Sequence, residues 1–364
     1  MFFNGVFKDK KVFITGHTGF KGSWLLSWLK MAGAEIQGYS LAPKPDHKLY
    51  GFIQGDDLCH SALHDILNYP VLEKCLVAFQ PDFVFHLAAQ PLVRYGYEEP
   101  LETFNINIMG TAHVLNAIRK LVKPCVAIMV TTDKVYHNIE KSYAYREEDR
   151  LGGYDPYSSS KACAELVIDA YRNSYFNKST YHEHKKTIVA ARAGNVIGGG
   201  DWAKDRMVPD IVRALQNNEP VLVRSPNSVR PWQHVLEPVH AYLLLAQKLA
   251  EHPESYHTEY NFGPEMADCL PVEKMVQRAI KTWKAGTYQI KQGKDAPHEA
   301  ILLKLDISRA ISDLKWKPMY TAFEAMDKTI NWYKEFTGGN ALDLIQENIR
   351  SFQDQYSKTM TTVH

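Results

Sequence analysis

The chain has 364 residues, 45% of them hydrophobic, and its 42 Lys and Arg against 41 Asp and Glu give a formal net charge of +1. This composition excludes a disordered chain, and the balanced charge without a long basic run argues against nucleic-acid binding. Neither the first residues nor any later apolar run has the character of an export signal or a membrane span, so we expect a cytoplasmic protein. Five cysteines without a CxxC pair indicate scattered reduced thiols.

Short β-rich runs alternate with longer runs of helical periodicity through the first half of the chain. The strand candidates, in chain order, are residues 12–15, 35–39, 82–86, 126–130 and 187–192. The helix candidates are residues 21–31, 70–79, 101–121 and 158–176. This alternation is typical of an α/β fold with a doubly wound parallel sheet, the Rossmann architecture.

Beyond residue 193 the regular alternation gives way to loops rich in Gly, Pro, Asn and Asp, with helices expected near residues 208–217 and 272–283. We therefore predict a Rossmann domain over residues 1–193 and mainly a second, smaller α/β lobe over residues 194–364. Part of residues 230–262 is expected to return to the Rossmann domain.

The stretch GHTGFKG, residues 16–22, lies between the first strand candidate and the first helix candidate. A Rossmann first turn needs one glycine for the tight bend, one for the approach of a pyrophosphate and one for close packing of the helix on the strand. Gly16, Gly19 and Gly22 fit these roles, and Thr18 and Phe20 lie in the same turn. Free N–H groups of the following helix would bind the diphosphate without a basic cluster, so the motif predicts a dinucleotide site.

The end of the second strand does not decide which dinucleotide is bound. An NAD site usually has an acidic residue there, whereas this chain has Gly38-Tyr39-Ser40-Leu41. An arginine for a 2′-phosphate is also missing, although Lys44 and Lys48 follow. The residues alone leave NAD and NADP open.

A YxxxK pair opens the last helix candidate of the first half. Tyr157 and Lys161 lie on one helix face, and an ammonium beside a phenol favours the phenolate, so the tyrosine could act as acid and base near neutral pH. A second YxxxK pair at residue 181 lacks comparable surroundings, whereas the first pair follows a Thr-Asp-Lys tripeptide at the sheet edge where open α/β folds bind ligands. The predicted catalytic pair is therefore Tyr157 and Lys161, and the family resemblance described next adds Thr132, Asp133 and Lys134 of that tripeptide to the predicted catalytic residues. No metal site is expected, because the HxxxH pair at residues 60 and 64 is predicted to lie in a strand and its turn.

The glycine spacing and the Thr-Tyr-Lys set resemble the extended short-chain dehydrogenase/reductase superfamily, whose larger members act on nucleotide sugars. Longer stretches (GHTGFKGSWL, AAQPLV, GYDPYSSSKACAEL, RAGNVIGGGDW, RPWQHVLEP and LKLD) are similar to the CDP-glucose 4,6-dehydratases over nearly the whole chain. This resemblance implies NAD as cofactor, CDP-glucose as substrate, bound in the second lobe, and deoxysugar synthesis for lipopolysaccharide O-antigen. It also implies a homodimer or dimer of dimers formed through the helices near residues 101–121 and 158–176.

The same resemblance implies roles for further residues. Expected cofactor contacts, besides the glycine turn, Tyr157 and Lys161, are Asp65, Ile66, Leu87, Ala88, Ala89 and Asn107. Asp65 could equally cap a helix. Expected substrate contacts are Gln90, Thr132, Asn195, Arg206, Arg230 and His298, of which the two arginines suit phosphate oxygens.

An aspartate directly after the Ser/Thr is typical of 4,6-dehydratases in this superfamily, whereas 4-epimerases usually carry no acid there. Oxidation at C4 of the hexose makes the C5 proton acidic; a base can then remove it while an acid releases the C6 hydroxyl as water. Asp133, with its pKa raised in a closed site, could be that acid. Lys134 replaces a common glutamate and could be the C5 base or could stabilise the enolate. The alternatives are a 4-epimerase or reductase, which needs no Asp133, and a non-catalytic NAD-binding protein.

Overall fold

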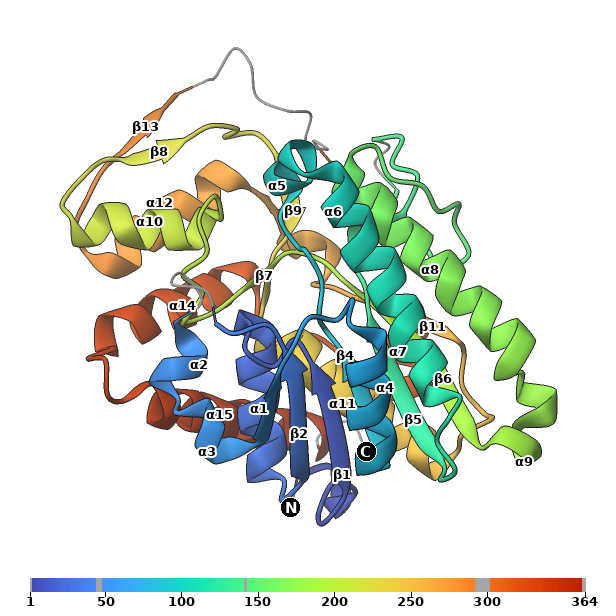
Figure 1. Ribbon diagram of the computed structural model, residues 1–364. Coiled ribbons are helices and arrows are strands. Elements are labelled where there is room, and N and C mark those ends of the chain that lie inside the picture. Colours follow the sequence, from blue (N-terminus) through green and yellow to red (C-terminus); the bar gives the residue numbers. More distant parts are fainter. Residues whose placement is uncertain (1, 44–47, 141–142, 292–301, 362–364) are drawn as a thin grey trace.

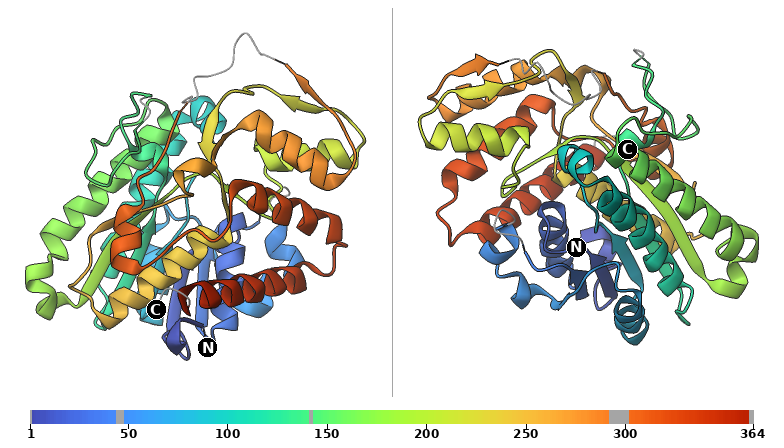
Figure 2. Two further views of the ribbon diagram at one scale, coloured as in Figure 1. Left: turned by 180° about the vertical axis from the view of Figure 1, so that it is seen from behind. Right: turned by 45° about the horizontal axis from the view of Figure 1, so that its top comes forward.

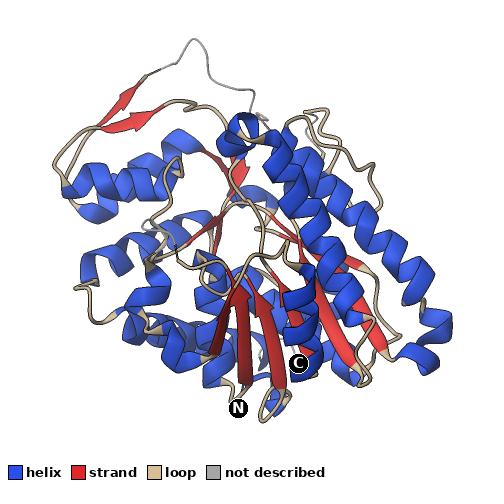
Figure 3. Ribbon diagram, viewed as in Figure 1, coloured by secondary structure: helices blue, strands red, loops and turns tan. Residues whose placement is uncertain are grey.

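The computed structural model describes residues 2–43, 48–140, 143–291 and 302–361. Its centre is a seven-stranded parallel sheet in the order β11-β6-β5-β4-β1-β2-β3 (Figure 3). The five strand candidates are confirmed to within one residue at each end. The strands are β1 (Lys11–Thr15), β2 (Glu35–Ser40), β3 (His60–Leu63), β4 (Phe83–His86), β5 (Cys125–Val130), β6 (Lys186–Ala193) and β11 (Glu259–Phe262).

Helices cover both faces of the sheet because its strands are apolar on both sides. Val12 and Ile14 of β1 pack into one core, whereas Phe13 between them packs into the other. The first core includes α1 (Phe20–Met31), α11 (Leu236–Glu251) and α15 (Ala341–Thr361). The second includes α4 (Tyr69–Phe79), α7 (Gly110–Ile118) and α8 (Pro156–Tyr175), of which α7 and α8 lie on the right in Figure 1. The doubly wound fold is therefore confirmed.

The single helix expected over residues 101–121 is interrupted. The structure has α6 (Pro100–Phe104), a π-helical segment (Asn105–Met109) and then α7. Within the π-helical segment Asn107 is buried and hydrogen-bonded. Such segments occur frequently at functional sites, and this one depends on tertiary contacts that helical periodicity does not encode.

Short strand pairs and helices form a second region beside the sheet, at the upper left of Figure 1. The strand pairs are β7 (Val196–Ile197) with β10 (Gln233–His234), β9 (Val229–Pro231) with β12 (Cys269–Pro271) and β8 (Val221–Val223) with β13 (Tyr288–Ile290). Helices α10 (Met207–Gln216) and α12 (Val272–Trp283) confirm the two helices expected there. The longer helix α14 covers Ala322–Glu335. The short helical elements of the chain are α2 (Leu49–Phe52), α3 (Gly55–Leu58), α5 (Val93–Glu98), the turn η3 (Asp133–Val135), α9 (Tyr181–His184) and α13 (Ser308–Leu314).

Two later segments lie on the central sheet. Within residues 230–262, α11 packs on the sheet and β11 pairs with β6. In addition, α15 packs on α1 through Phe352 and Trp28, whose ring centroids are 5.9 Å apart, and the left view of Figure 2, seen from behind, shows it crossing in front of the N-terminal elements. The division of the chain at residue 193 stays a prediction. Among the described residues, no helix combines the length and apolar character needed to cross a membrane.

Candidate active site

The glycine turn between β1 and α1 is shaped so closely that side chains would not fit. Gly16 has φ +77°, and a Cβ there would stand 2.7 Å from the backbone nitrogen of Ala88. A Cβ on Gly22 would stand 2.2 Å from the carbonyl oxygen of Gly16. Gly19 is the N-cap of α1 and provides no side-chain hydrogen bond to it. The turn therefore brings bare backbone and the start of α1 together, which fits a dinucleotide diphosphate.

Polar contacts fix the neighbouring walls of this cradle. The Thr18 hydroxyl lies 2.8 Å from Ser40 Oγ and donates to the carbonyl of Leu41 at 3.1 Å, at the end of β2. Asp65 is exposed, and its Oδ1 accepts from the backbone N–H of Leu67 at 2.8 Å. Asp65 thus caps a turn, while Asn68 is the N-cap of α4, so the helix-cap alternative is wrong for this residue. Its contact with a cofactor stays a prediction.

Gln90 and Asn107 form a buried polar pair above the sheet edge. Asn107 accepts from the Gln90 backbone N–H at 2.9 Å and donates to the Gln90 carbonyl at 3.1 Å and to Ser160 Oγ at 2.8 Å. The Gln90 amide donates to Thr103 Oγ1 at 2.8 Å. Asn107 thereby connects the loop after β4, which contains Leu87, Ala88 and Ala89, with α8, and the Gln90 side chain connects the same loop with α6. Ile66 is buried against Gly110, at the start of α7.

Tyr157 and Lys161 lie on the first turns of α8, whose N-cap Asp155 accepts from the Ser158 N–H at 3.0 Å. Lys161 is buried, and its Nζ donates to the carbonyl of Val130 at 3.1 Å. Burial lowers the pKa of Lys161 to about 8, and the charge of Glu165 opposes that shift. Burial raises the pKa of Tyr157 to about 12, and a hydrogen bond with Thr132 acts in the opposite direction.

Asp133, in η3, is 1% exposed and faces the same site. Its Oδ1 accepts from the Thr132 hydroxyl at 3.0 Å, whereas Oδ2 has no hydrogen-bond partner within the described part of the chain. Burial raises the pKa of Asp133, although Lys134 and other positive charges oppose this. The Lys134 Nζ lies 5.9 Å from the centroid of the Tyr157 ring. The structure therefore brings all five predicted catalytic residues together.

Cations surround this cluster. Arg206 forms an ion pair with Asp201 at 3.0 Å, and its charge lowers the pKa of Tyr157. The charge of Arg230, in β9, lowers the pKa of Asp133. Asn195 lies between β6 and β7, where its carbonyl accepts from the Gln233 N–H at 3.0 Å. His298 lies outside the described residues, and the ligand contacts of the other three stay predictions.

Lys21 is a residue of this cluster to which the sequence reasoning gave no role. Its Nζ lies 3.4 Å from the Tyr242 hydroxyl of α11. Burial lowers the pKa of Lys21 to about 7, and the charges of Arg206 and Lys161 act in the same direction. The position of this lysine inside the glycine motif is the sequence feature that could have indicated a role in the site.

Comparison with known proteins agrees with this geometry. The model of the family described as GDP-mannose 4,6 dehydratase matches residues 13–329. The chain belongs to the GDP-mannose 4,6 dehydratase family. A relative in this family, the CDP-glucose 4,6-dehydratase of Salmonella typhimurium, is 43% identical over 97% of this chain and 98% of that protein. The family resemblance indicated by the sequence motifs is therefore confirmed.

Solved structures share the fold of this family. The dTDP-glucose 4,6-dehydratase of Bacillus anthracis in complex with NAD has a TM-score of 0.74 at 20% identity, covering 92% of this chain and 99% of that one. The UDP-glucuronic acid 4-epimerase of Bacillus cereus in complex with UDP-glucuronic acid and NAD has a TM-score of 0.75 at 22% identity, covering 89% and 99%. Dehydratases and epimerases thus share this architecture, and the chemistry has to be read from the site residues.

Proposed function

We propose that this protein is an NAD-dependent CDP-glucose 4,6-dehydratase, which converts CDP-glucose to CDP-4-keto-6-deoxyglucose. The observation that carries the proposal is the buried carboxyl of Asp133, with one oxygen unpartnered among the described residues, in the same site as Tyr157. A 4-epimerase has no step that requires such an acid. The name of the 43% identical relative supports CDP-glucose as the substrate.

The glycine turn supports NAD as the cofactor. Gly16 and Gly22 let the backbone of the turn pack where a Cβ would clash, Gly19 begins α1 without a side chain, and the solved structures named above include NAD complexes of the same fold. When bound, NAD supplies the hydride chemistry, accepting a hydride from C4 of the hexose and returning it to C6. The protein supplies the proton transfers and the orientation of the sugar.

Tyr157 is the base for the C4 hydroxyl. To accept that proton the phenol must first be ionised, and the Thr132 hydrogen bond and the charge of Arg206 both lower its pKa. The Lys161 ammonium, one helical turn along α8, stabilises the phenolate. The Thr132 hydroxyl, which donates its single proton to Asp133 Oδ1 in this structure, can turn that proton toward the Tyr157 phenolate, so one hydroxyl connects the base of the first step with the acid of the second.

Asp133 is the acid for the elimination. In its protonated form, favoured by burial, the carboxyl gives a proton to the departing C6 hydroxyl, which leaves as water. After one cycle Tyr157 holds the proton from the C4 hydroxyl and Asp133 is ionised. A proton must therefore pass from Tyr157 to Asp133 before the next cycle. Lys134 either takes the C5 proton itself or stabilises the enolate while another group takes that proton, and the group that took it returns a proton to C5 when the hydride reaches C6. Exchange of C5 hydrogen with solvent in Lys134→Met distinguishes these roles.

The assay is incubation of the purified protein with NAD and a panel of nucleotide sugars. CDP-glucose should give a 4-keto product that absorbs in alkali, without net accumulation of reduced cofactor, and Tyr157→Phe should give none. Formation of CDP-galactose instead would identify an epimerase. Binding of NAD without turnover of any nucleotide sugar would identify the non-catalytic alternative.

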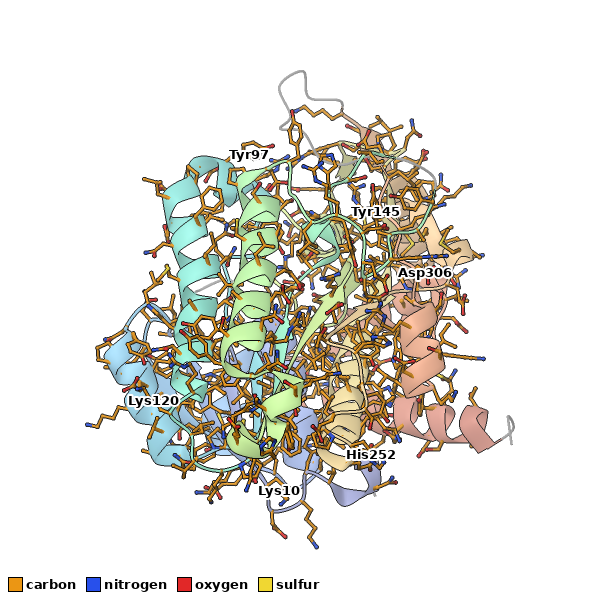
Figure 4. All side chains as sticks on the ribbon, turned by 90° about the vertical axis from the view of Figure 1, so that its right-hand side faces the viewer. Lys10, Tyr97, Lys120, Tyr145, His252 and Asp306 are labelled. Carbon is orange, nitrogen blue, oxygen red and sulfur yellow. The ribbon has the colours of Figure 1, made fainter. Side chains whose placement is uncertain are left out.

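The protein's cellular role and assembly are part of the same proposal. It acts in the cytoplasm in deoxysugar synthesis for O-antigen and assembles as a homodimer or dimer of dimers through the faces of α6, α7 and α8. The large apolar side chains exposed there support this contact, with Leu101 of α6 84% exposed and Leu166 of α8 59% exposed. Figure 4 views these helices side by side, and light scattering measures the oligomer directly.

A further inference from the structure

A buried ion pair lies one helical turn beyond Lys161. The Arg192 guanidinium, from β6, donates through Nε and NH2 to the two carboxylate oxygens of Glu165 on α8, each at 3.0 Å. Both side chains are buried. Tyr157, Lys161 and Glu165 follow one another at intervals of four residues on α8, so they form a stripe on one helix face, and Glu165 is its least exposed member.

The end of β5 contacts two members of this stripe through consecutive residues. The carbonyl of Val130 accepts from Lys161 Nζ at 3.1 Å, and the hydroxyl of Thr131 donates to Glu165 Oε1 at 2.5 Å. The Thr131 backbone N–H donates to the carbonyl of Ala191, the residue before Arg192. The strand ends that carry the catalytic tripeptide and the arginine are thus fixed to α8 at the level of Lys161 and Glu165.

Glu165 is the acidic side chain four residues beyond Lys161 on the same face of α8. It raises the pKa of Lys161, against the effect of burial. Among the described residues, Lys161 also interacts with Lys21 of α1, which is cationic when protonated, and with His86 of β4, while Tyr157 lies one helical turn before it on α8. Burial lowers the pKa of His86 to about 3, so this imidazole is neutral at physiological pH.

We propose that Glu165 is a positioning residue for the oxidation step. It keeps the Lys161 ammonium charged one helical turn from Tyr157, while Arg192 and Thr131 hold the Glu165 carboxylate at the ends of β6 and β5. This inference rests on the proposed function for its catalytic consequence. The titration of Lys161 itself does not depend on which sugar the enzyme uses.

Arg192 connects the stripe to a wider buried network. Its NH1 donates to the Tyr136 hydroxyl and the carbonyl of Glu147, each at 2.9 Å. Tyr136 donates to Asn261 Oδ1 at 2.6 Å, and the Asn261 amide donates to the carbonyls of Tyr145 and Asp306. Figure 4 labels Tyr145 and Asp306 on the same side of the molecule, to the right of α8. A purely structural Glu165 would stabilise this network and leave Lys161 unaffected, so the two roles predict different results.

The test compares Glu165→Gln with the wild type by NMR of isotope-labelled lysine side chains, with the Lys161 signal assigned through Lys161→Met. Removing the carboxylate charge should lower the pKa of Lys161 by about one unit. Because oxidation needs the charged form of Lys161, the pH above which the rate of sugar oxidation stops rising should fall by the same amount as the Lys161 pKa. Glu165→Asp, which keeps the charge, should restore most of both values.

Glu147→Gln is the matched control, because Glu147 is buried in the same network and accepts from the Asn261 backbone N–H at 2.8 Å. It should lower the melting temperature without changing the titration of Lys161. If Glu165→Gln does not fold, the double variant Glu165→Gln/Arg192→Met leaves no unpaired buried charge and should still show the lowered Lys161 pKa. An unchanged Lys161 titration in a folded Glu165 variant would overturn the proposal, whatever its activity.

Discussion

The two oxygens of the Asp133 carboxyl have different surroundings. Oδ1 accepts from Thr132, whereas Oδ2 has no partner within the described residues and faces Gly194, on which an added Cβ would stand 3.2 Å away. A glycine opposite the free oxygen leaves space for a substrate group. In the Asp133 carboxyl, the hydrogen bond to Oδ1 therefore fixes the orientation of the group, while Oδ2 can reach the leaving hydroxyl.

Asp133→Asn tests this assignment. The amide keeps the size and one acceptor but cannot give up a carboxyl proton, so oxidation at C4 should continue while water elimination falls by about a hundredfold or more. Rapid-mixing absorbance of the reduced cofactor follows the first step, and the 6-deoxy product measures the second. Turnover at the wild-type rate would show that Asp133 is not the acid.

A site residue can be predicted from the sequence when a short motif defines it, but not when its role depends on a partner far away in the chain. Tyr157, Lys161 and Asp133 were found because a short motif and its place after a strand define them. Glu165 lies in the same sequence stretch on α8, yet its partner Arg192 is 27 residues away on strand β6, so no local pattern indicates the pair. Lys21 was missed for a similar reason, because Tyr242 contacts it from a distant helix.

At the scale of elements, the β1 turn and α1 depend on the absence of a Cβ at Gly22. Gly22→Ala would place a methyl group 2.2 Å from the Gly16 carbonyl oxygen, which is backbone and cannot move aside. The helix must then shift away from the turn, at a cost of about 1–3 kcal/mol in the free energy of unfolding. NAD affinity, measured by calorimetric titration, should fall together with the melting temperature.

Gly51→Ala is the control for this substitution. Gly51 lies in the short helix α2, and an added Cβ there would meet nothing within 4 Å. Alanine also favours a helix over glycine. This variant should keep its NAD affinity, and its melting temperature should not fall. Equal losses of affinity and melting temperature in both variants would contradict the role of Gly22 in the dinucleotide site.

The elements differ in how clearly the sequence encodes them. Strands of the central sheet were predicted because compact apolar runs alternate with helical patterns. Helix α11 was not assigned, since nearly all of its residues are buried and it lacks the one-sided apolar stripe that helical periodicity requires. The π-helical segment was missed because Asn107 is held there by Gln90 and Ser160, which are distant in sequence.

At the scale of the whole molecule, Glu237 connects the central sheet region with the chain before α14. It lies in the first turn of α11, fully buried, and its Oε1 accepts from the backbone N–H groups of Met319 and Tyr320, each at 2.9 Å. Its Oε2 has no hydrogen-bond partner within the described segments. A carboxyl in this position is more stable protonated than ionised.

This arrangement makes global stability depend on pH. Burial raises the pKa of Glu237 from 4.5 to about 8, so unfolding releases a proton between these values. The stability that the protonated carboxyl contributes is complete below pH 4.5 and is lost as the pH rises toward 8, by about 1.4 kcal/mol per pH unit. Above pH 8 the loss is complete.

Glu237→Gln removes this dependence while keeping an oxygen for the two N–H groups. The variant and the wild type should have similar melting temperatures near pH 4.5, and the variant should become progressively more stable than the wild type up to pH 8. Glu251→Gln, at the exposed end of the same helix, should follow the wild-type curve at every pH. Parallel curves for wild type and Glu237→Gln would mean that the carboxyl is ionised in the folded protein, and that α11 and the chain before α14 are joined by a charged contact.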